Sequence, residues 1–396
     1  MMDGTIPTGS RIQNRTMGFS EATASYEAWL RKQTPVIEED LRRKYQKMRE
    51  GGVFTFLRGT FYRWTELWEA NRKELRQTGV LIPKAPELFC VGDLHVENFG
   101  TWRDTEGRLI WGINDFDEAY PLRYLNDLVR LATSSYFALK EIKANWSFSH
   151  EAACAAILLG YQEGLAEGGK PFVLAQGLPW LWKIVTDPSR TPEQFWEKLN
   201  EKMKKPKGRG MRQVIKDAAH ALKQCAPDDP TLRAMPLMTR QAGVGSLGRP
   251  RFVQRFEGRS GQILREAKKI APSACVFAGF GKSINDAYRK ILRSAVRVPD
   301  PFFAVVNDWS VRRLAFDSDK IDLQSLETIE AVQSFFRAMG AETANIHLGS
   351  ANTRAVERHV KAQLSANPRW LVQAAEAMVK ATEADFNELK KTDLGS

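Results

Sequence analysis

The sequence contains few cysteines and no long apolar run. Its four cysteines, Cys90, Cys154, Cys225 and Cys275, lie far apart and form no C-x-x-C pair, so we expect reduced core thiols and no disulfide framework. The longest apolar stretch, 152–161, falls short of the roughly 20 residues that a membrane-spanning helix needs. The first residues are polar and lack the apolar segment of a secretory signal, so we expect a cytoplasmic protein without a membrane span.

Histidine is scarce too, and its placement gives no sign of a metal site. The chain has 5 histidines, which are His95, His150, His220, His347 and His359. The last four are isolated on helical segments, and no metal-ligand spacing joins them. His95 lies in an acidic motif, where we expect it to pack or to orient its loop rather than to take part in chemistry.

Acidic residues are outnumbered by basic ones. There are 58 Lys and Arg against 47 Asp and Glu, a formal net charge of +11 at pH 7. Such an excess favours acidic partners: nucleotides, phosphorylated metabolites, nucleic acid or an anionic membrane. The densest basic run spans 201–212, where Pro206, Gly208 and Gly210 interrupt any helix. We interpret this run as a solvated loop, or alternatively as a loop that binds an anion or steers a substrate.

The chain does contain long helical patterns on either side of a β-rich segment. Apolar residues recur at helical intervals over 22–75, 122–232 and 326–391. Over 235–316, glycines and strand-like alternation with one helical segment replace that pattern. The sequence therefore predicts an α+β fold in three parts. These are a first, mainly helical part that includes the acidic motifs, a smaller β-rich unit and a last helical part, at 1–234, 235–316 and 317–396.

Two acidic motifs, within 92–118, end short apolar runs that we interpret as strands. The runs are "ELFCVGD" and "LIWGIND", with "TWRDTEGR" between them as a turn. The motifs "GDLHVENFG" and "NDFDEA" are therefore expected at neighbouring strand ends. Buried carboxylates are costly in such places unless they are paired or bound to a cation.

The residue types in these motifs match the needs of phosphoryl transfer. That reaction needs a carboxylate to orient or deprotonate the attacking hydroxyl and oxygen ligands to hold Mg²⁺ against the ATP phosphates. We predict Asp93 as the base, Asn98 and Asp115 as metal ligands, and Asp117 as a further ligand. Mg²⁺ would offset the repulsion between the clustered carboxylates. In the alternative interpretation Asp93, Asn98 and Asp115 only cap turns between strands.

A glycine-rich motif lies in the β-rich segment. "GVGSLG" places Gly243, Gly245 and Gly248 in a G-x-G-x-x-G pattern, with Ser246 among them. A dinucleotide-binding fold needs a helix after this pattern, whereas the alternation in "RPRFVQRF" predicts a strand. Glycines at a turn between two strands are typical of a kinase-type turn that covers phosphates, because backbone without side chains can approach the phosphates closely. An ordinary glycine-rich hairpin is the alternative.

These motifs resemble the catalytic core of small-molecule phosphotransferases of the aminoglycoside phosphotransferase type. That family has G-D-x-H-x-x-N, then I-D-[FW]-[DE], then D-L-A, and "GDLHVENFG", "INDFDE" and "NDLVRLA" are similar to them in order. The resemblance implies a protein-kinase-like fold with two lobes, ATP and Mg²⁺ as cofactors, and a structural role for Asp127 in the large lobe.

The chain resembles even more closely a large family of bacterial proteins known only as a domain of unknown function. Besides the two acidic motifs, the similar segments are "LRRKYQKMREGGVFTFLRGTFYRW", "AGVGSLG", "REAKKIAPS", "PDPFFAVVNDWSVRRL" and "ETANIHLGSAN". They run from about Leu41 to the C-terminal helices. Because the glycine motif follows the acidic motifs instead of preceding them, we infer a circular permutation of the kinase-like order. The small lobe is then expected at 235–316.

The sequence departs from the family pattern in the strand after the glycine motif. The family pattern has K-E-A where this chain has Arg265, Glu266 and Ala267, so the phosphate-binding cation is predicted to be Arg265 or else Lys268. Asp286 stands where a glutamate is expected on the next helix, and a longer cation facing a shorter anion would keep the ion pair.

The expected function is ATP- and Mg²⁺-dependent transfer of a phosphoryl group to a hydroxyl of a small molecule or protein. Three alternatives remain: transfer of AMP on the same fold, a protein that binds nucleotide without turnover, and a basic nucleic-acid-binding protein. For the last of these, the sequence contains no RNA-binding motif and no helix-turn-helix pattern. Arg58, in "FLRGT", is either a structural arginine or a substrate contact.

Overall fold

The computed structural model describes residues 17–142, 144, 146–187, 191–206, 211–259, 261–284, 286–318, 320–350 and 352–395. The expectations about a secretory signal and about the middle of the basic run concern 1–16 and 207–210, which lie outside these ranges.

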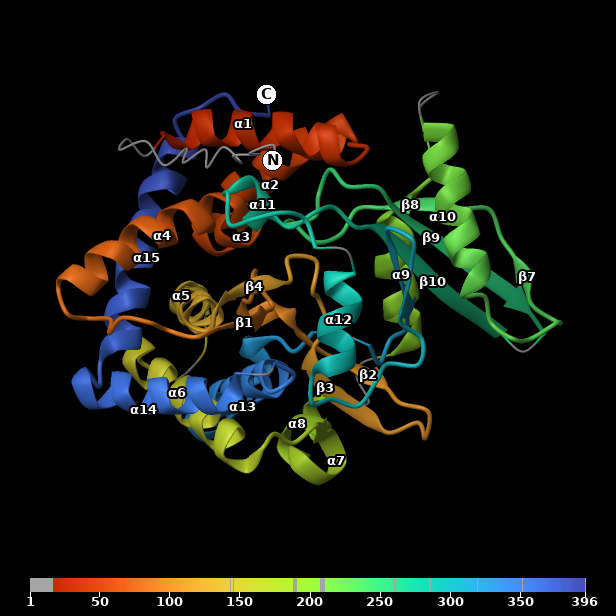
Figure 1. The fold of residues 1–396 in the computed structure, drawn as a ribbon. Helices are drawn as coiled ribbons and strands as arrows, with labels where there is room; N and C mark the ends of the chain where they lie inside the picture. The colour runs from red at the N-terminus through yellow and green to blue at the C-terminus, as the bar shows by residue number, and fades with distance from the viewer. Residues whose placement is uncertain are drawn as a thin grey trace, which may run out of the picture.

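The fold combines helices and small antiparallel sheets, which confirms the predicted α+β class. A helical body lies beside a β-rich unit that contains β9, β10 and α10 (Figure 1). The α-helices of the helical body are α1 (Phe19–Gln33), α2 (Glu38–Glu50), α3 (Gly52–Gly59), α4 (Phe61–Gln77), α5 (Leu125–Glu141), α6 (His150–Glu167), α7 (Leu174–Gly177), α8 (Pro179–Val185), α11 (Ala274–Phe277), α12 (Ala287–Ser294), α13 (Ile329–His347), α14 (Thr353–Ala366) and α15 (Trp370–Leu389). Two 3-10 helices are η1 (Val96–Asn98) and η3 (Leu323–Ser325).

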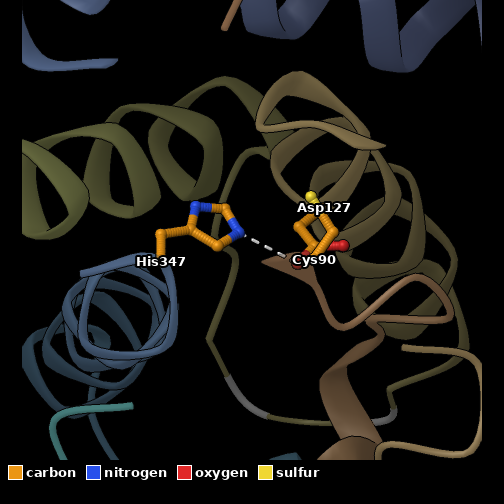
Figure 2. A group of neighbouring side chains, drawn as sticks. All are labelled: Cys90, Asp127 and His347. Atoms are coloured by element: carbon orange, nitrogen blue, oxygen red, sulfur yellow. Dashed lines mark hydrogen bonds and ion pairs between the residues drawn. The ribbon is translucent and has the colours of Figure 1, made fainter. Parts of the chain in front are cut away.

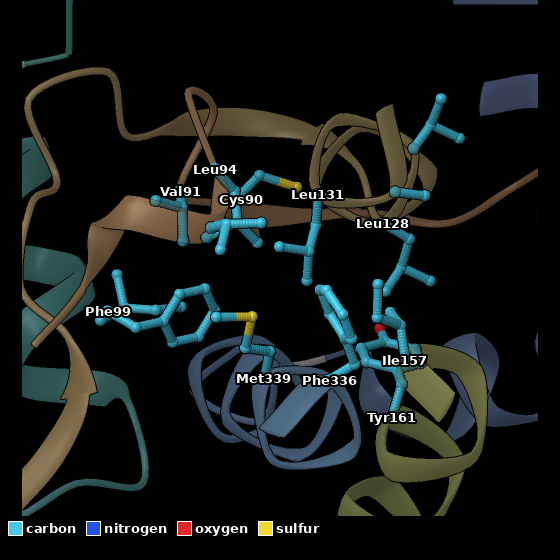
Figure 3. Packing of buried hydrophobic residues seen from close by; sticks show 14 of the residues in the cluster. Cys90, Val91, Leu94, Phe99, Leu128, Leu131, Ile157, Tyr161, Phe336 and Met339 are labelled. Atoms are coloured by element: carbon cyan, nitrogen blue, oxygen red, sulfur yellow. The ribbon is translucent and has the colours of Figure 1, made fainter. Parts of the chain in front are cut away.

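The core of the helical body centres on α6 and α13, whose backbones nearly touch. A Cβ atom added to Gly340 would lie 2.0 Å from the carbonyl oxygen of Ile157, so only glycine allows this crossing. Figure 3 shows Phe336 of α13 near Ile157 of α6, and Met339 of α13 near Phe99, which belongs to the first acidic motif. The first acidic motif therefore rests on the main hydrophobic core.

Two small sheets hold the acidic motifs. β1 (Glu87–Cys90) pairs with β4 (Tyr120–Arg123), while β2 (Phe99–Arg103) and β3 (Leu109–Ile113) form a hairpin joined by β5 (Phe172–Val173). The predicted turn 101–108 was thus wrong in its first three residues, which belong to β2. The chain turns at Asp104, whose Oδ1 accepts backbone N–H groups of Glu106 (3.0 Å) and Arg108 (2.8 Å).

The β-rich unit is one antiparallel sheet in the order β11-β12-β10-β9-β8-β6, with β7 beside β9. Its elements are β6 (Met203–Lys204), β7 (Arg233–Ala234), β8 (Met238–Arg240), β9 (Arg251–Gly258), β10 (Gly261–Lys269), β11 (Ala304–Val306), β12 (Trp309–Leu314), α9 (Pro192–Glu201) and α10 (Arg212–Gln224). The sheet thus extends before residue 235, where we placed its start. Conversely, α11 and α12 lie within 235–316 but bury Cys275 and Ile291 in the core of the helical body.

The two helices of this unit cover opposite faces of the sheet. Val214, Ala218 and Leu222 form an apolar stripe on α10 that packs on Phe252 and Trp309. On the other face, Leu199 of α9 packs against Val253 and Leu264. The remainder of that second face is polar and lines a cleft.

The four cysteines are free, and Cys90, Cys154 and Cys275 are buried, as predicted. Within the described ranges, the structure contains no helix with both the length and the apolar composition needed to cross a membrane.

Candidate functional site

A large cleft separates the β-rich unit from the helical body and contains both acidic motifs and the glycine turn, which we define as 241–250. Its volume is about 1040 Å³. Among the described residues, thirteen Lys and Arg side chains line it, against six Asp and Glu side chains. The basic residues are Lys44, Lys47, Arg58, Lys198, Lys202, Arg240, Arg249, Arg251, Arg293, Arg297, Arg312, Arg313 and Lys320, and the acidic ones are Asp93, Glu97, Asp115, Asp117, Glu118 and Asp300. The walls therefore favour an anionic ligand.

Asp93 lines the cleft between β1 and η1, and a buried arginine holds it. The carboxylate Oδ1 of Asp93 accepts from Nε (3.1 Å) and Nη2 (2.5 Å) of Arg130, which is fully buried on α5. The guanidinium of Arg130 lies over the ring of Trp64, 5.2 Å from its centroid. Burial raises the pKa of Asp93 to about 6, although Arg130 opposes the rise. A carboxylate with this pKa can act as a general base near neutral pH.

A buried network below Asp93 fixes the backbone of its loop. Asp127 on α5 accepts the backbone N–H groups of Val91 (2.7 Å) and Gly92 (2.9 Å). Its Oδ2 also contacts Nε2 of His347 at 3.0 Å, and His347 Nδ1 bonds to the hydroxyl of Tyr161 at 2.7 Å. Asp127 thus acts on the first acidic motif through main-chain hydrogen bonds.

Cys90, Asp127 and His347 point toward one another from β1, α5 and α13 (Figure 2). Within the described ranges, this is the single group of three His, Cys, Asp or Glu ligand atoms that all lie within 4.8 Å of one another. Burial raises the pKa of the Cys90 thiol well above its ordinary value, so it is not a thiolate at neutral pH. Asp127 and His347 already have protein partners, so we interpret the group as structural.

Asn98 and His95 shape the end of the first acidic motif. Oδ1 of Asn98 accepts the backbone N–H of His95 at 2.7 Å, and Nδ1 of His95 accepts that of Glu97 at 3.2 Å. Burial lowers the pKa of His95 well below its ordinary value, so the ring stays neutral and orients the loop. The contact of Asn98 with the backbone of His95 is the turn-capping contact that our alternative interpretation of this motif predicted. An amide oxygen has two lone pairs, so the same atom can also bind a cation.

The second acidic motif converges on a lysine of the sheet. Lys268 of β10 places its Nζ 3.1 Å from both carboxylate oxygens of Asp115 and 2.8 Å from Oδ2 of Asp117. Partial burial raises the pKa of Asp115, but the ammonium group of Lys268 outweighs this and holds the pKa below its ordinary value. Arg249 adds a contact of 3.3 Å to Asp117 Oδ2.

The two acidic motifs lie side by side because β2 and β3 pair with Phe99 opposite Ile113. The backbone N–H of Asn114 donates to the carbonyl oxygen of Asn98 at 3.0 Å, directly between the motifs. Oδ1 of Asp117 is buried and has no hydrogen-bond partner among the residues that the structure describes, which fits an oxygen that binds a cation. Asn98, Asp115 and Asp117 together offer the hard oxygen donors that Mg²⁺ prefers.

The glycine turn connects β8 to β9, which pair as antiparallel neighbours. Gly243 (φ 69°) and Gly248 (φ 100°) adopt the left-handed backbone that favours glycine. A Cβ atom added to Gly245 would lie 3.7 Å from Oδ2 of Asp93, so the turn reaches the first acidic motif. The hydroxyl of Ser246 already has a protein partner, because its Oγ accepts a hydrogen bond from Nη2 of Arg251 at 2.7 Å.

Helix α2 and Ile37, the residue before it, form hydrogen bonds with the glycine turn. The backbone N–H of Ile37 donates to the carbonyl oxygen of Gly248 at 2.8 Å. Gln241, at the start of the turn, accepts from Nη1 of Arg43 at 2.9 Å and donates to Asp40 at 2.5 Å. The turn is therefore docked on the helical body.

Two of the predicted nucleotide contacts, Arg265 and Asp286, lie away from the cleft. Side chains alternate along β10, so Lys268 faces the acidic motifs while Arg265 faces the opposite side of the sheet. Nε of Arg265 donates to the carbonyl oxygen of Cys225 at 3.2 Å, and its guanidinium lies over Phe302. Asp286 is exposed and pairs with Arg289, three residues along the chain. The expected ion pair between Arg265 and Asp286 is therefore not formed, and Lys268 instead pairs with the second acidic motif.

A buried glutamate with three arginines was not predicted. Glu266, 1% exposed, contacts Arg240, Arg251 and Arg312, with 2.9 Å from Oε1 to both Arg251 and Arg312. Burial raises the pKa of Glu266, but Arg251 and then the other arginines hold it well below its ordinary value. These four residues come from four strands, β8, β9, β10 and β12, so no short motif connects them in the sequence.

A second unpredicted carboxyl supports the strand that leads to Asp115. Glu342 on α13 is 2% exposed and accepts from the backbone N–H of Ile113 (3.1 Å) and from Nδ2 of Asn345 (2.8 Å). Burial raises its pKa to about 7, against the lowering effect of Arg297. This helix thereby fixes the end of β3, directly before the second acidic motif.

The substitution Glu342→Gln is expected to change how stability depends on pH. The pKa of Glu342 is raised from 4.5 to about 7 in the folded state, so its contribution is complete below pH 4.5 and is lost as the pH rises through 7. The variant keeps a neutral side chain at every pH. Between about pH 5 and pH 8 the wild type should therefore lose up to ~3 kcal/mol of unfolding free energy relative to the variant, as urea titrations would measure.

The exposed Glu74 on α4 supplies a matched control. Glu74→Gln makes the same chemical change at the surface and should leave the pH profile of the wild type unaltered. Parallel profiles for wild type and Glu342→Gln would show that Glu342 is not held protonated.

Comparison with known proteins gives a family and no named activity. A family model described as "Uncharacterized protein conserved in bacteria (DUF2252)" matches residues 36–176 and 189–392, which is most of the chain. No curated protein and no solved structure matches.

Proposed function

The chain belongs to this bacterial family, and we propose that it is an ATP- and Mg²⁺-dependent phosphotransferase with a circularly permuted protein-kinase-like fold. One observation supports this most: the glycine turn, Asp93, Asp115 and Asp117 line one cationic cleft, and Lys268 forms ion pairs with the last two of these residues. Phosphoryl transfer requires a base, metal ligands and a phosphate-binding cation in one place.

The charge and the volume of the cleft fit this proposal. The cleft of about 1040 Å³ reaches the upper end of the range of roughly 300–1000 Å³ for small-ligand pockets. Its basic residues outnumber its acidic ones by about two to one, as a polyphosphate ligand requires. Clefts between two structural units are a common place for such ligands.

Each residue has a role in the proposed reaction. Asp93 accepts the proton of the acceptor hydroxyl, and Arg130 holds its carboxylate in position. Asn98, Asp115 and Asp117 would hold Mg²⁺, which neutralises phosphate charge when bound. The glycine turn offers backbone N–H groups to the phosphates.

Lys268 also bears on the alternative of a protein that binds nucleotide without turnover. That alternative depended on arginine replacing the usual lysine at position 265. Because Lys268 faces the acidic motifs in place of Arg265, a lysine at the expected position supports turnover.

The order of the elements fits a permutation. The acidic motifs at 92–118 come first, the glycine turn and β10 follow, and the chain returns from β12 through 315–328 to α13 in the helical body. In a kinase-like fold this last crossing corresponds to the hinge between the lobes. The large lobe would then consist of the first and last parts of the chain.

Transfer of labelled phosphate from ATP would test the proposed function. The protein is incubated with γ-labelled or α-labelled ATP, with Mg²⁺ or with EDTA, and with a panel of metabolites and proteins. We expect Mg²⁺-dependent movement of the γ label and a rise in melting temperature with Mg·ATP. Movement of the α label would instead show AMP transfer, and no thermal shift with Mg·ATP would refute nucleotide binding.

A further inference from the structure

Lys44 on α2 is a buried cation at the edge of the glycine turn. It is 6% exposed and lines the cleft. Its Nζ donates to the carbonyl oxygen of Gly245 at 3.4 Å, which is long for a hydrogen bond. Within the described ranges, no carboxylate oxygen lies within 4.0 Å of the Lys44 ammonium nitrogen.

Such a lysine is costly for the protein alone. Lysine is rarely buried unless it is paired, because its charge loses hydration. Burial lowers the pKa of Lys44 to about 8, and the positive charge of Arg249 adds to this effect, so the side chain remains mostly protonated at neutral pH. A buried, charged side chain that lines a cleft and has no salt-bridge partner among the described residues indicates that a ligand supplies the paired anion.

Lys44 lies on the Asp93 side of the cleft. Gly245, whose carbonyl oxygen it contacts, is also the glycine that approaches Asp93. The charges of Glu27, Asp93 and Glu118 raise the pKa of Lys44, although none of these carboxylates forms a salt bridge with it within the described ranges. Glu118 is held elsewhere by the backbone N–H of Ala274 at 2.7 Å. The acceptor hydroxyl must lie beside Asp93, which places Lys44 within the acceptor part of the site.

The nucleotide side of the cleft already has its own cation. Lys268 contacts Asp115 and Asp117, the residues assigned to Mg²⁺ and the phosphates. The surplus of basic residues and the volume of about 1040 Å³ leave charge and room for a second, small anionic ligand.

We propose that Lys44 binds an anionic group of the acceptor, so that the acceptor is a small hydroxyl compound that bears a phosphate or a carboxylate. This inference rests on the proposed function. In the transfer step the acceptor oxygen bonds to the γ-phosphorus of ATP, its proton moves to Asp93, and the bond to the β–γ bridging oxygen breaks to release ADP.

Calorimetric binding of simple anions tests the assignment. The full chain is saturated with Mg²⁺ and a non-hydrolysable ATP analogue and titrated with inorganic phosphate or, separately, with acetate. For wild type we expect binding of at least one of them, and which one binds distinguishes a phosphate from a carboxylate acceptor. Lys44→Met should weaken that binding by about 10- to 100-fold, because a charged hydrogen bond is lost.

Two further readouts separate this role from a structural one. The affinity for the Mg²⁺ nucleotide analogue should not change in Lys44→Met. Its melting temperature without anion should stay the same or rise, since a desolvated charge has been replaced by an apolar chain of similar volume. Lys32→Met, at an exposed position on α1 outside the cleft, removes the same charge and should leave anion binding intact.

Three outcomes would overturn the proposal: no binding of either anion by wild type, equal anion binding by wild type and Lys44→Met, or displacement of the nucleotide analogue by the anion. The last outcome, or weaker binding of nucleotide by Lys44→Met, would make Lys44 a contact of the nucleotide phosphates. If the anion binds through Lys44 but the nucleotide analogue does not bind at all, the proposed phosphotransferase function fails while the anion site is supported.

Discussion

Asp93→Asn is expected to lower the rate of phosphoryl transfer by about 10²- to 10⁴-fold, the usual contribution of a general base. Asparagine has nearly the same shape as aspartate but cannot accept the proton of the acceptor hydroxyl. Because Asp115, Asp117 and Lys268 are unchanged, affinity for Mg·ATP should remain as in wild type. Turnover of labelled ATP and calorimetric nucleotide binding would measure the two effects separately.

The pH profile gives an independent measurement of the same residue. Burial raises the pKa of Asp93 to about 6, so the carboxylate form that accepts a proton is depleted as the pH falls below 6. The wild-type rate should therefore rise up to about pH 6 and then level off. The residual rate of Asp93→Asn should lack this rise, and a wild-type rate unaffected by pH around 6 would argue against Asp93 as the base.

The substitution also breaks a buried ion pair, and Asp385 offers a control for that effect. Asp385 on α15 is 6% exposed and pairs with Arg63 at 2.7 Å, and it does not line the cleft. Asp385→Asn makes the same change in a comparable pair and should reduce stability without reducing the transfer rate. An equal loss of rate in both variants would attribute the effect of Asp93→Asn to folding.

Asp115→Ala is expected to lower the transfer rate by about 10²- to 10³-fold and to weaken its dependence on Mg²⁺. A bound metal contributes several kcal/mol of charge stabilisation in the transition state, and each 1.36 kcal/mol changes the rate tenfold. The variant also leaves Lys268 with Asp117 as its remaining carboxylate partner among the described residues. Rates across a Mg²⁺ titration, with ATP saturating, would measure the change in metal dependence.

Asp308→Ala is the matched control. Asp308 pairs with Lys269, the residue after Lys268 in β10, but it is exposed and does not line the cleft. Its removal takes a carboxylate from a neighbouring lysine and should leave both the rate and its Mg²⁺ dependence unchanged. If Asp115→Ala kept the metal dependence of wild type, Asp115 would have to be removed from the metal site.

Local sequence patterns were sufficient where structure depends on neighbours in the chain. The main helical patterns, the strand β9 in the β-rich segment and the four free cysteines follow from periodicity and spacing, and the structure has them. Asp93 and Asp115 each follow a short strand as predicted, and both line one cleft. Residues of one short motif lie close together in the structure because only a few backbone dihedral angles separate them.

Register and long-range contacts were beyond the sequence. The sequence predicted Arg265 as the phosphate-binding cation, or else Lys268, because an offset of one residue in a strand reverses the face of every side chain. Only the pairing of β10 with β9 and β12 placed Lys268 on the face of the sheet that meets the acidic motifs.

The sequence by itself determined the α+β composition, the two acidic motifs and the glycine turn. The tertiary structure alone brought Arg130 to Asp93, Lys44 to Gly245 and Glu342 to the end of β3. The physical reason is that burial and ion pairing depend on distances in space. Packing of helices and sheets brings together residues that are far apart in the sequence, and their separation along the chain does not predict the distance between them.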